Sequence, residues 1–484
     1  MKPQSVESRS RPGISGGHVH DAVHDAVSPA LSLPTGMART GPIGLPELSE
    51  VDVVRHFTAA SGASHGVDVG PYPLGSCTMK YNPKRNDRLA VLDGFRHVHP
   101  LQPGDSTPGL WEMMAELQEA LAEITGMDAV TLQPAAGAHG ELTGLFVIRR
   151  HFERRGERRT TILTPDSAHG TNPASAAMAG FRCRMVPTRP DGLLDVAALA
   201  KLVDDDVAAM MLTNPSTFGL FEEQILEISD LVHGRGGLLY YDGANLNALM
   251  GLVRPGDMGF DVMQVNLHKT FSAPHGGGGP GAGPCGVKAF LEPYLPRPVI
   301  RRVNGRAVAD DDRPESIGKV KAHAGHVEVL VKALAYVLTC GPAGLRRASE
   351  DAVLNANYVR ARLEDLLPPI FAKRCMHECL LGGGSLTISP FDFVKRLIDL
   401  GVHPPSLVGA GCVHMPDRYT AGMLVEPTES ESLASLDFMI EQFRRVAKEA
   451  ATAPYMIETA PHTTRVAKVI KDEEAYLMRV EATP

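Results

Sequence analysis

Residues 237–245 have the sequence Gly-Leu-Leu-Tyr-Tyr-Asp-Gly-Ala-Asn, an apolar run that ends in polar residues. Similar apolar runs lie before and after it, at 161–164 (Thr-Ile-Leu-Thr), 207–212 (Val-Ala-Ala-Met-Met-Leu) and 262–265 (Val-Met-Gln-Val). Between several of these runs the spacing is helical, as in residues 222–233, where Ile225, Ile228 and Leu231 share one face. Near-continuous apolar strands that alternate with helices predict a mostly parallel sheet covered on both faces.

The regions on either side of this alternation differ from it. Before it, apolar residues from Trp111 to Ile124 recur every three or four positions, which predicts a helix that Gly126 ends. After about residue 330, predicted helices at 345–367, 391–400 and 433–447 are mixed with shorter strands, which indicates a smaller α+β domain. We therefore expect four parts: a flexible N-terminal arm (1–45), an N-terminal segment with the large domain (46–330), a small domain (331–455) and a C-terminal extension (456–484).

Composition narrows the class of protein. The 484 residues are 43% hydrophobic and 21% charged, as in globular proteins, and the net charge of −8 gives no reason to expect nucleic-acid binding. Seven irregularly spaced cysteines do not form a disulfide framework, which favours a reducing cytoplasm. The sequence has no run of 18 apolar residues and no apolar core of a signal peptide in its first forty positions, so we expect no membrane span.

Small and polar residues gather in four segments at the predicted strand ends. They are Ala135-Ala-Gly-Ala-His-Gly140, Ser167-Ala-His-Gly-Thr-Asn172, Tyr241-Asp-Gly-Ala-Asn245 and Asn266-Leu-His-Lys-Thr-Phe271. Ligands of open α/β sheets bind at the carboxyl ends of the strands. The first segment opens a predicted helix at 141–150, whose exposed N–H groups would suit a phosphate, with an ordinary tight turn as the competing interpretation.

Two side chains in these segments point to a particular chemistry. Asp242 follows an apolar strand, where its carboxylate could pair with a protonated ring nitrogen or, alternatively, cap the residues that follow. Lys269 follows the next predicted strand, and an amine held in a pocket can form a Schiff base with an aldehyde cofactor. A solvated surface lysine is the usual alternative, but the neighbouring segments favour the cofactor.

Two other motifs are rejected. A formal G-x-G-x-x-G match starts at Gly276, but Pro274, Pro280 and Pro284 disfavour the helix that a dinucleotide site requires. The segment Cys375-Met-His-Glu-Cys379 lacks the second ligand pair of a zinc site, so no metal site is predicted.

Taken together, the four segments resemble the fold-type-I (aspartate-aminotransferase-like) pyridoxal-phosphate enzymes. More closely, the chain is similar to subunit 2 (beta) of the two-subunit P-protein of the glycine cleavage system. The similarity extends from about residue 45 to 470, and the first forty residues and 406–421 fit it less well. The segments that carry it are 73–80 (Pro-Leu-Gly-Ser-Cys-Thr-Met-Lys), 123–141, 166–175, 266–272, 401–405 (Gly-Val-His-Pro-Pro), 425–429 (Val-Glu-Pro-Thr-Glu) and 460–464 (Ala-Pro-His-Thr-Thr).

This resemblance implies a role for each matching residue of the cofactor site. Lys269 would hold pyridoxal phosphate as a Schiff base, Asp242 would pair with the pyridine nitrogen, and His169 would stack on the ring. Asn245 would hydrogen-bond the phenolic oxygen, and Asn214 is expected to line the pocket, although Asn-Pro is also a common turn.

The resemblance assigns further residues to the phosphate and to the substrate channel. Backbone groups of Ala136, Gly137 and Ala138 would bind the phosphate, helped by the side chain of His268. Ser76, Cys77 and Thr78 would approach the substrate channel.

The implied activity is that of a glycine dehydrogenase (aminomethyl-transferring, decarboxylating), an oxidoreductase of glycine catabolism. Glycine would form an external aldimine, lose carbon dioxide, and pass its aminomethyl group to the lipoyl arm of the H-protein. An alpha chain would complete an α2β2 heterotetramer.

Two alternatives stay open. Another fold-type-I enzyme, such as a desulfurase, decarboxylase or aminotransferase, would leave Cys77-Thr-Met-Lys80 and the glycine-rich loop unexplained. A non-catalytic paralogue would keep the fold, but Lys269, Asp242 and His169 are intact.

Overall fold

The computed structural model describes residues 10–11, 14, 36–37, 41, 44–99, 102–276, 281–382, 388–408 and 422–464. The chain divides into two compact units, residues 1–66 with 459–484 and residues 67–458. Most of the predicted arm (1–45) and most of the predicted extension (456–484) lie outside the described residues. In the first unit, helix α2 (Glu50–Ser61) is capped by the Ser49 side chain.

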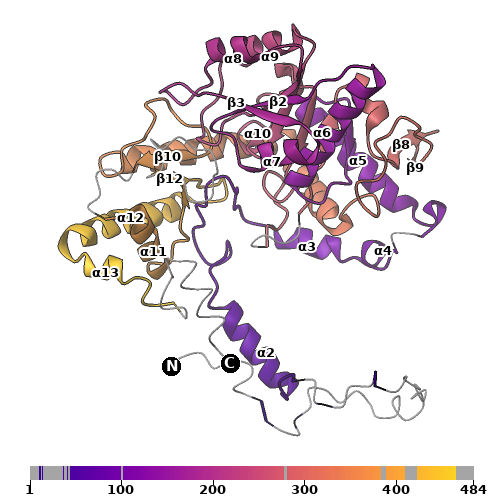
Figure 1. The fold of residues 1–484 in the computed structure, drawn as a ribbon. Coiled ribbons are helices and arrows are strands. Elements are labelled where there is room, and N and C mark those ends of the chain that lie inside the picture. Colours follow the sequence, from indigo (N-terminus) through magenta and orange to yellow (C-terminus); the bar gives the residue numbers. More distant parts are fainter. Residues whose placement is uncertain are drawn as a thin grey trace, which may run out of the picture. The chain divides into compact units, whose positions relative to one another are not determined.

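A seven-stranded sheet is the centre of the second unit (Figure 1). Its strands are β1 (Ala129–Thr131), β2 (Thr161–Pro165), β3 (Arg182–Val186), β4 (Val207–Thr213), β5 (Leu238–Gly243), β6 (Val262–Val265) and β7 (Cys285–Val287). They lie in the order β1-β7-β6-β5-β4-β2-β3. Of these seven strands, β7 is the one that runs in the opposite direction, antiparallel to β1 on one side and to β6 on the other. The predicted mostly parallel sheet is therefore confirmed, and β2, β4, β5 and β6 are the four strands that the apolar runs indicated.

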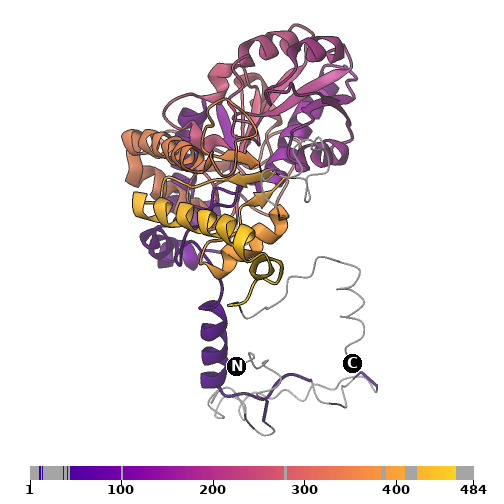
Figure 2. The same ribbon diagram turned by 90° about the vertical axis from the view of Figure 1, so that its left-hand side faces the viewer.

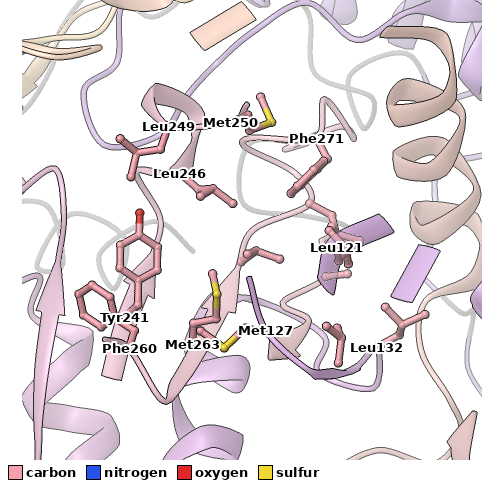
Figure 3. Packing of buried hydrophobic residues seen from close by; sticks show 14 of the residues in the cluster. Leu121, Met127, Leu132, Tyr241, Leu246, Leu249, Met250, Phe260, Met263 and Phe271 are labelled. Carbon is pink, nitrogen blue, oxygen red and sulfur yellow. The ribbon is translucent and has the colours of Figure 1, made fainter. Parts of the chain in front are cut away.

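Both faces of this sheet are buried, as predicted. Along β5, Tyr240 belongs to one hydrophobic cluster and Tyr241 to another, because successive side chains of a strand point to opposite faces. On the Tyr241 face, Phe260 packs edge-on against the tyrosine ring with centroids 4.9 Å apart, and Met263 lies beside them (Figure 3).

The helices of this part are α3 (Lys84–Ala90), α4 (Asp93–Arg96), α5 (Pro108–Thr125), α6 (Gly137–Arg154), α7 (Thr171–Met178), α8 (Val196–Leu202) and α9 (Ile225–His233). Short 3-10 turns are η2 (Gly104–Ser106), η3 (Leu246–Ala248), η4 (Pro255–Met258) and η5 (Ala289–Tyr294). Helix α5 ends at Gly126, whose φ of 71° is the left-handed conformation expected of a glycine at this position. Helix α6 begins four residues earlier than predicted, and α9 begins three residues later.

Two strands that the sequence did not indicate form a hairpin. They are β8 (Val299–Val303) and β9 (Arg306–Asp310), joined by Asn304 and Gly305. Both turn residues have positive φ (50° and 78°), which suits a tight hairpin turn.

The C-terminal part of this unit contains a small antiparallel sheet, β10 (Cys379–Gly382), β12 (Gly422–Val425) and β11 (Ser406–Leu407). Helices α11 (Pro390–Asp399), α12 (Leu433–Thr452) and α13 (Tyr455–Glu458) lie with it. Figures 1 and 2 show this orange and yellow part as a layer beside the magenta sheet region. It has a hydrophobic cluster of its own, in keeping with the predicted small α+β domain.

The long helix between the two parts differs from its prediction. Helix α10 (Val327–Leu363) begins 18 residues before the predicted start at 345. It has an apolar first half that ends at a break at Gly341 (φ 60°, ψ 179°), and the prediction covered only the half after this break. Its first half, together with Leu345 and Ala348 after the break, belongs to the core beside the large sheet, and its last turns (Ala356, Val359 and Leu363) belong to the core of the small sheet. The predicted domain boundary at 331 stays a prediction. Among the described residues, one helix, α10, is long and apolar enough to cross a membrane. Buried core helices pass the same test of length and composition, and α10 contributes buried side chains to the protein core.

Candidate active site

A cavity of about 110 Å³ lies at the carboxyl ends of the parallel strands, next to Lys269. Lys269 follows β6, and its Nζ donates a hydrogen bond of 2.6 Å to the carbonyl oxygen of Ser76. The cavity wall consists of Ser76, Gly137, Ala138, Glu141, His169, Thr171, Thr213, Thr217, Asp242, Ala244, Asn245, Gln264, Asn266 and Lys269. The structure thus brings together seven of the predicted site residues, from segments almost 200 positions apart.

Asp242 is held rigidly in this wall. It is 2% exposed, and its oxygens accept hydrogen bonds from Asn172 Nδ2 (2.9 Å), the Ala244 backbone N–H (3.1 Å) and Gln264 Nε2. Gln264 reaches it because residues 242 and 264 are paired between β5 and β6. A buried carboxylate with three donors stays fixed in one orientation and offers its negative charge to the cavity.

A second carboxyl group, Glu141 on α6, lies in the same wall. It accepts hydrogen bonds from the hydroxyls of Thr171 (2.8 Å) and Ser175 (2.9 Å). Burial, followed by the neighbouring charge of Asp242, raises the pKa of Glu141 to about 7. Near neutral pH this side chain can therefore hold or release a proton.

Thr171 connects Glu141 to His169. The Thr171 backbone N–H donates to His169 Nδ1 at 3.2 Å, and the Thr171 hydroxyl lies 2.9 Å from the same nitrogen. An Nδ1 that accepts a hydrogen bond leaves the imidazole proton on Nε2. Desolvation lowers the pKa of His169, although its ring remains accessible to solvent, and this favours the same neutral form.

We expect the Glu141→Gln variant to lose part of the pH dependence of folding. The pKa of Glu141 is higher in the folded protein than its ordinary value of 4.5, so this group favours folding most below pH 4.5. As pH rises from 4.5 to about 7, the unfolded chain releases the proton first, and the free energy of unfolding falls by up to about 1.4 kcal/mol per pH unit. Urea unfolding at a series of pH values should show a flatter profile for Glu141→Gln than for wild type. The exposed Glu364→Gln variant is the control, and parallel profiles for wild type and Glu141→Gln would contradict the expectation.

The amino end of α6 forms another side of the cavity. Ala136 stands before the helix in an extended conformation and cannot cap it with its side chain, and Gly137 and Ala138 are its first residues. A helix begins with N–H groups that lack intrahelical partners, which favours binding of an anion such as a phosphate.

Glycines allow this helix to lie directly against the strand ends. A Cβ on Gly137 would lie 2.5 Å from Asn266 Nδ2, and one on Gly140 would lie 2.5 Å from the Gly283 carbonyl oxygen and 2.7 Å from Gln264 Cβ. Replacement of Gly140 must therefore move the helix away from the strand ends, whereas a methyl group added at Gly137 would displace the end of the Asn266 side chain.

We expect Gly140→Ala to lower the free energy of unfolding by about 1–3 kcal/mol, because a backbone oxygen blocks the added methyl group. The displaced helix should also weaken binding of a phosphate-bearing ligand, which fluorescence titration would measure. The control is Gly94→Ala, where the added methyl group meets no atom within 4 Å. Equal stabilities of the two variants would contradict the packing argument.

Three predicted cofactor residues occupy different surroundings. Asn245 lines the cavity, its Nδ2 donates to the carbonyls of Pro215 (3.0 Å) and Ser216 (3.1 Å), and its buried Oδ1 has no partner among the described residues. Asn214 lies outside the cavity wall, with its Oδ1 bonded to the Glu222 N–H at 2.9 Å. His268 also lies outside the wall, and burial lowers its pKa to about 4, so its imidazole is neutral.

The segment Ser76–Thr78 reaches the cavity through Ser76. Ser76 and Thr78 have φ angles of 64° and 45°, in the left-handed region that L-residues seldom adopt. Burial raises the pKa of the Cys77 thiol between them.

Seven residues of the wall were given no role by the sequence prediction. They are Glu141, Thr171, Thr213, Thr217, Ala244, Gln264 and Asn266, and the same holds for Asn172 behind Asp242. Gln264 carried a usable signal, since it is a polar residue inside an otherwise apolar strand.

Known structures share this fold. The crystal structure of glycine decarboxylase (P-protein) of the glycine cleavage system, in inhibitor-bound form, superposes with a TM-score of 0.72 at 20% identity, covering 92% of this chain and 99% of that one. An apo cysteine desulfurase from Thermococcus onnurineus NA1 gives a TM-score of 0.60 at 14% identity, over 78% of this chain and 95% of the other. The architecture is that of the fold-type-I pyridoxal-phosphate enzymes.

Sequence relatives make the assignment more specific. Residues 348–465 match the family model described as glycine dehydrogenase, C-terminal domain. A probable glycine dehydrogenase (decarboxylating) subunit 2 of Caldanaerobacter subterraneus subsp. tengcongensis is 52% identical over 441 residues, 90% of each chain. One of the same name from Kosmotoga olearia is 47% identical over 470 residues, 96% of each chain. The chain belongs to the glycine dehydrogenase (decarboxylating) subunit 2 family.

Proposed function

We propose that this chain is the lysine-bearing subunit of a pyridoxal-phosphate-dependent glycine decarboxylase of the glycine cleavage system. The observation that carries the proposal is the meeting of Lys269 and Asp242 in one cavity at the strand ends. Family membership supplies glycine as the substrate.

The donor and acceptor groups of the cavity fit pyridoxal phosphate. The lysine amine suits its aldehyde, the carboxylate of Asp242 suits its pyridinium N–H, and the helix α6 amino end suits its phosphate. The unpartnered Oδ1 of Asn245 is a buried polar atom that a bound molecule could satisfy. When bound, the cofactor withdraws electrons from the substrate carbon that loses carbon dioxide.

We assign the following tasks to the chain's own residues. Lys269 holds the cofactor covalently, and Asp242 keeps the ring nitrogen protonated. His169, neutral and tied to Thr171, would stack on the ring, and the backbone N–H groups of Ala136, Gly137 and Ala138 would bind the phosphate. Asn245 would hydrogen-bond the phenolic oxygen. Asn214 and His268 lie outside the cavity wall; His268 would help to bind the phosphate and Asn214 would lie beside the pocket.

The family name implies a partner, because a subunit 2 works with a subunit 1. We propose an α2β2 assembly of the two subunits that transfers the aminomethyl group to the lipoyl arm of the H-protein. The cysteines in the described ranges are all free thiols, which suits a reducing cytoplasm.

Exchange of labelled bicarbonate into the carboxyl group of glycine tests this function. The purified chain would be mixed with subunit 1, lipoylated H-protein, glycine and pyridoxal phosphate, and label in glycine would be counted. We expect exchange that requires this chain and the lipoyl group. Its absence, with the cofactor visibly bound, would favour a different fold-type-I reaction, and absence of both would favour a non-catalytic paralogue.

A further inference from the structure

Two buried carboxyl groups and an imidazole lie beside the segment Ser76–Thr78. Glu378 stands directly before β10 and Glu426 directly after β12, and the pairing of Cys379 with Val425 brings them side by side. With His377, they are at most 1% exposed. The cofactor assignments above use none of these three side chains.

The two carboxyl groups hold the backbone of this segment. Glu378 Oε2 accepts from the Ser76 N–H at 2.7 Å, and Glu426 accepts from the Thr78 N–H (3.0 Å) and the Thr78 hydroxyl (2.6 Å). Ser76 and Thr78 are the two residues of this segment that have left-handed φ angles. Such a conformation persists where the surroundings impose it, and here the two carboxyl groups do so.

The imposed conformation has a direct effect at Lys269. It turns the Ser76 carbonyl toward the cavity, where that oxygen accepts the hydrogen bond from Lys269 Nζ. Glu378 also accepts from Asn245 Nδ2 at 3.2 Å, so it contacts the cavity wall at a second point.

We propose that Glu378 and Glu426 are positioning residues, which hold Ser76–Thr78 so that the Ser76 carbonyl binds and orients the amine of Lys269 whenever that nitrogen is free of the cofactor. This inference rests on the proposed function, because it assumes that Lys269 is the cofactor lysine.

The charges around this group agree with such a role. Burial raises the pKa of Glu378 well above its ordinary value and that of Glu426 above its own, and the Lys269 cation opposes both shifts. Burial lowers the pKa of His377 to about 3, so its ring is neutral. Its Nε2 lies 3.9 Å from Glu378 Oε1 and 3.8 Å from Glu426 Oε1. The two acids and Lys269 therefore influence one another's charge, as expected of ionisable groups buried close together.

The same three residues could in principle ligate a cation, since their ligand atoms lie within 4.8 Å of one another. The carboxyl oxygens already accept hydrogen bonds from the chain, and the Lys269 cation lies nearby. We therefore assign the group to the lysine, and a bound metal is an outcome that the experiment can detect.

The test measures the reactivity of Lys269 in the cofactor-free chain. Wild type, Glu378→Gln, Glu426→Gln and the exposed control Glu364→Gln would be treated briefly with an amine-acylating reagent, and modification would be quantified by mass spectrometry. We expect Lys269 to be modified about three to ten times faster in the two buried variants, because its amine is released from Ser76. The exposed Lys201 should react equally in all four proteins and serves as the internal standard.

A rescue variant distinguishes positioning from general loss of structure. Glycine adopts the left-handed conformation without an anchor, so adding Ser76→Gly to Glu378→Gln should return the modification rate toward that of wild type. Failure of this rescue, or Lys269 reactivity unchanged in both single variants, would overturn the proposal. A stoichiometric metal in wild type that is lost in His377→Gln would also overturn it. Wild type that gains no visible absorbance with pyridoxal phosphate would instead refute the proposed function.

Discussion

Replacement of Lys269 by alanine is expected to lower glycine–bicarbonate exchange by about 10⁴-fold or more. Losses of this size are typical when an enzyme loses a side chain that forms a covalent bond during turnover. The side chain extends into the cavity from the end of β6, opposite the Ser76 carbonyl, and within that wall it is the one amine. Alanine therefore leaves a cofactor held through its phosphate and ring nitrogen alone.

Two measurements separate this chemical loss from a loss of structure. The variant should lack the visible absorbance of a lysine-bound cofactor, yet unfold at nearly the wild-type urea concentration. Lys201→Ala, at an exposed position of α8, should keep both absorbance and exchange. Exchange within about tenfold of wild type in Lys269→Ala would show that another group performs this role.

The sheet could be predicted from sequence where its strands are buried on both faces. Strands β2, β4, β5 and β6 carry the apolar runs, because helices cover both of their sides. Strand β3 was missed, since it is an edge strand with the sequence Arg-Cys-Arg-Met-Val and exposed side chains. Strands β1 and β7 have three residues each, too few to show a period.

The break in α10 shows a different limit. Gly341-Pro342 looks like a helix boundary, and the prediction placed the helix after it. The chain continues as a helix on both sides, because Gly341 alone absorbs the change of direction at a φ of 60°. Local sequence shows where a chain can bend but not how far the helix extends beyond the bend.

The site was predictable where a residue lies at or shortly after the carboxyl end of a predicted strand. Asp242 is the penultimate residue of β5 and Lys269 lies four residues after β6, and the parallel sheet brings such residues to one edge. Gln264 depends on the register between β5 and β6, and Asn172 on how α7 starts. Glu378 lies more than 100 residues from Lys269, directly before the small sheet, and no local pattern indicates its hydrogen bond with Ser76, which in turn binds the lysine.

The second large effect is expected at Asp242. Asparagine has nearly the same shape but no charge, so it cannot keep a ring nitrogen protonated. We expect Asp242→Asn to lower exchange by about 10²–10⁴-fold at full cofactor occupancy, a size typical of removing a charged group that stabilises developing charge. Exchange rate and visible absorbance, measured on the same samples, would separate turnover from binding.

A structural cost must be distinguished from this electronic one. Three donors face the Asp242 carboxylate, and an asparagine turns one NH₂ toward them, which should cost about 1–3 kcal/mol of unfolding free energy. Asp261→Asn is the matched control, because Asp261 is also buried, accepts from His233 (2.7 Å) and the Leu239 N–H (2.8 Å), and lies at the opposite end of β6. It should lose comparable stability and keep exchange. If both variants lose exchange alike, burial explains the effect. If Asp242→Asn alone loses it, the charge at the strand end is what the reaction needs.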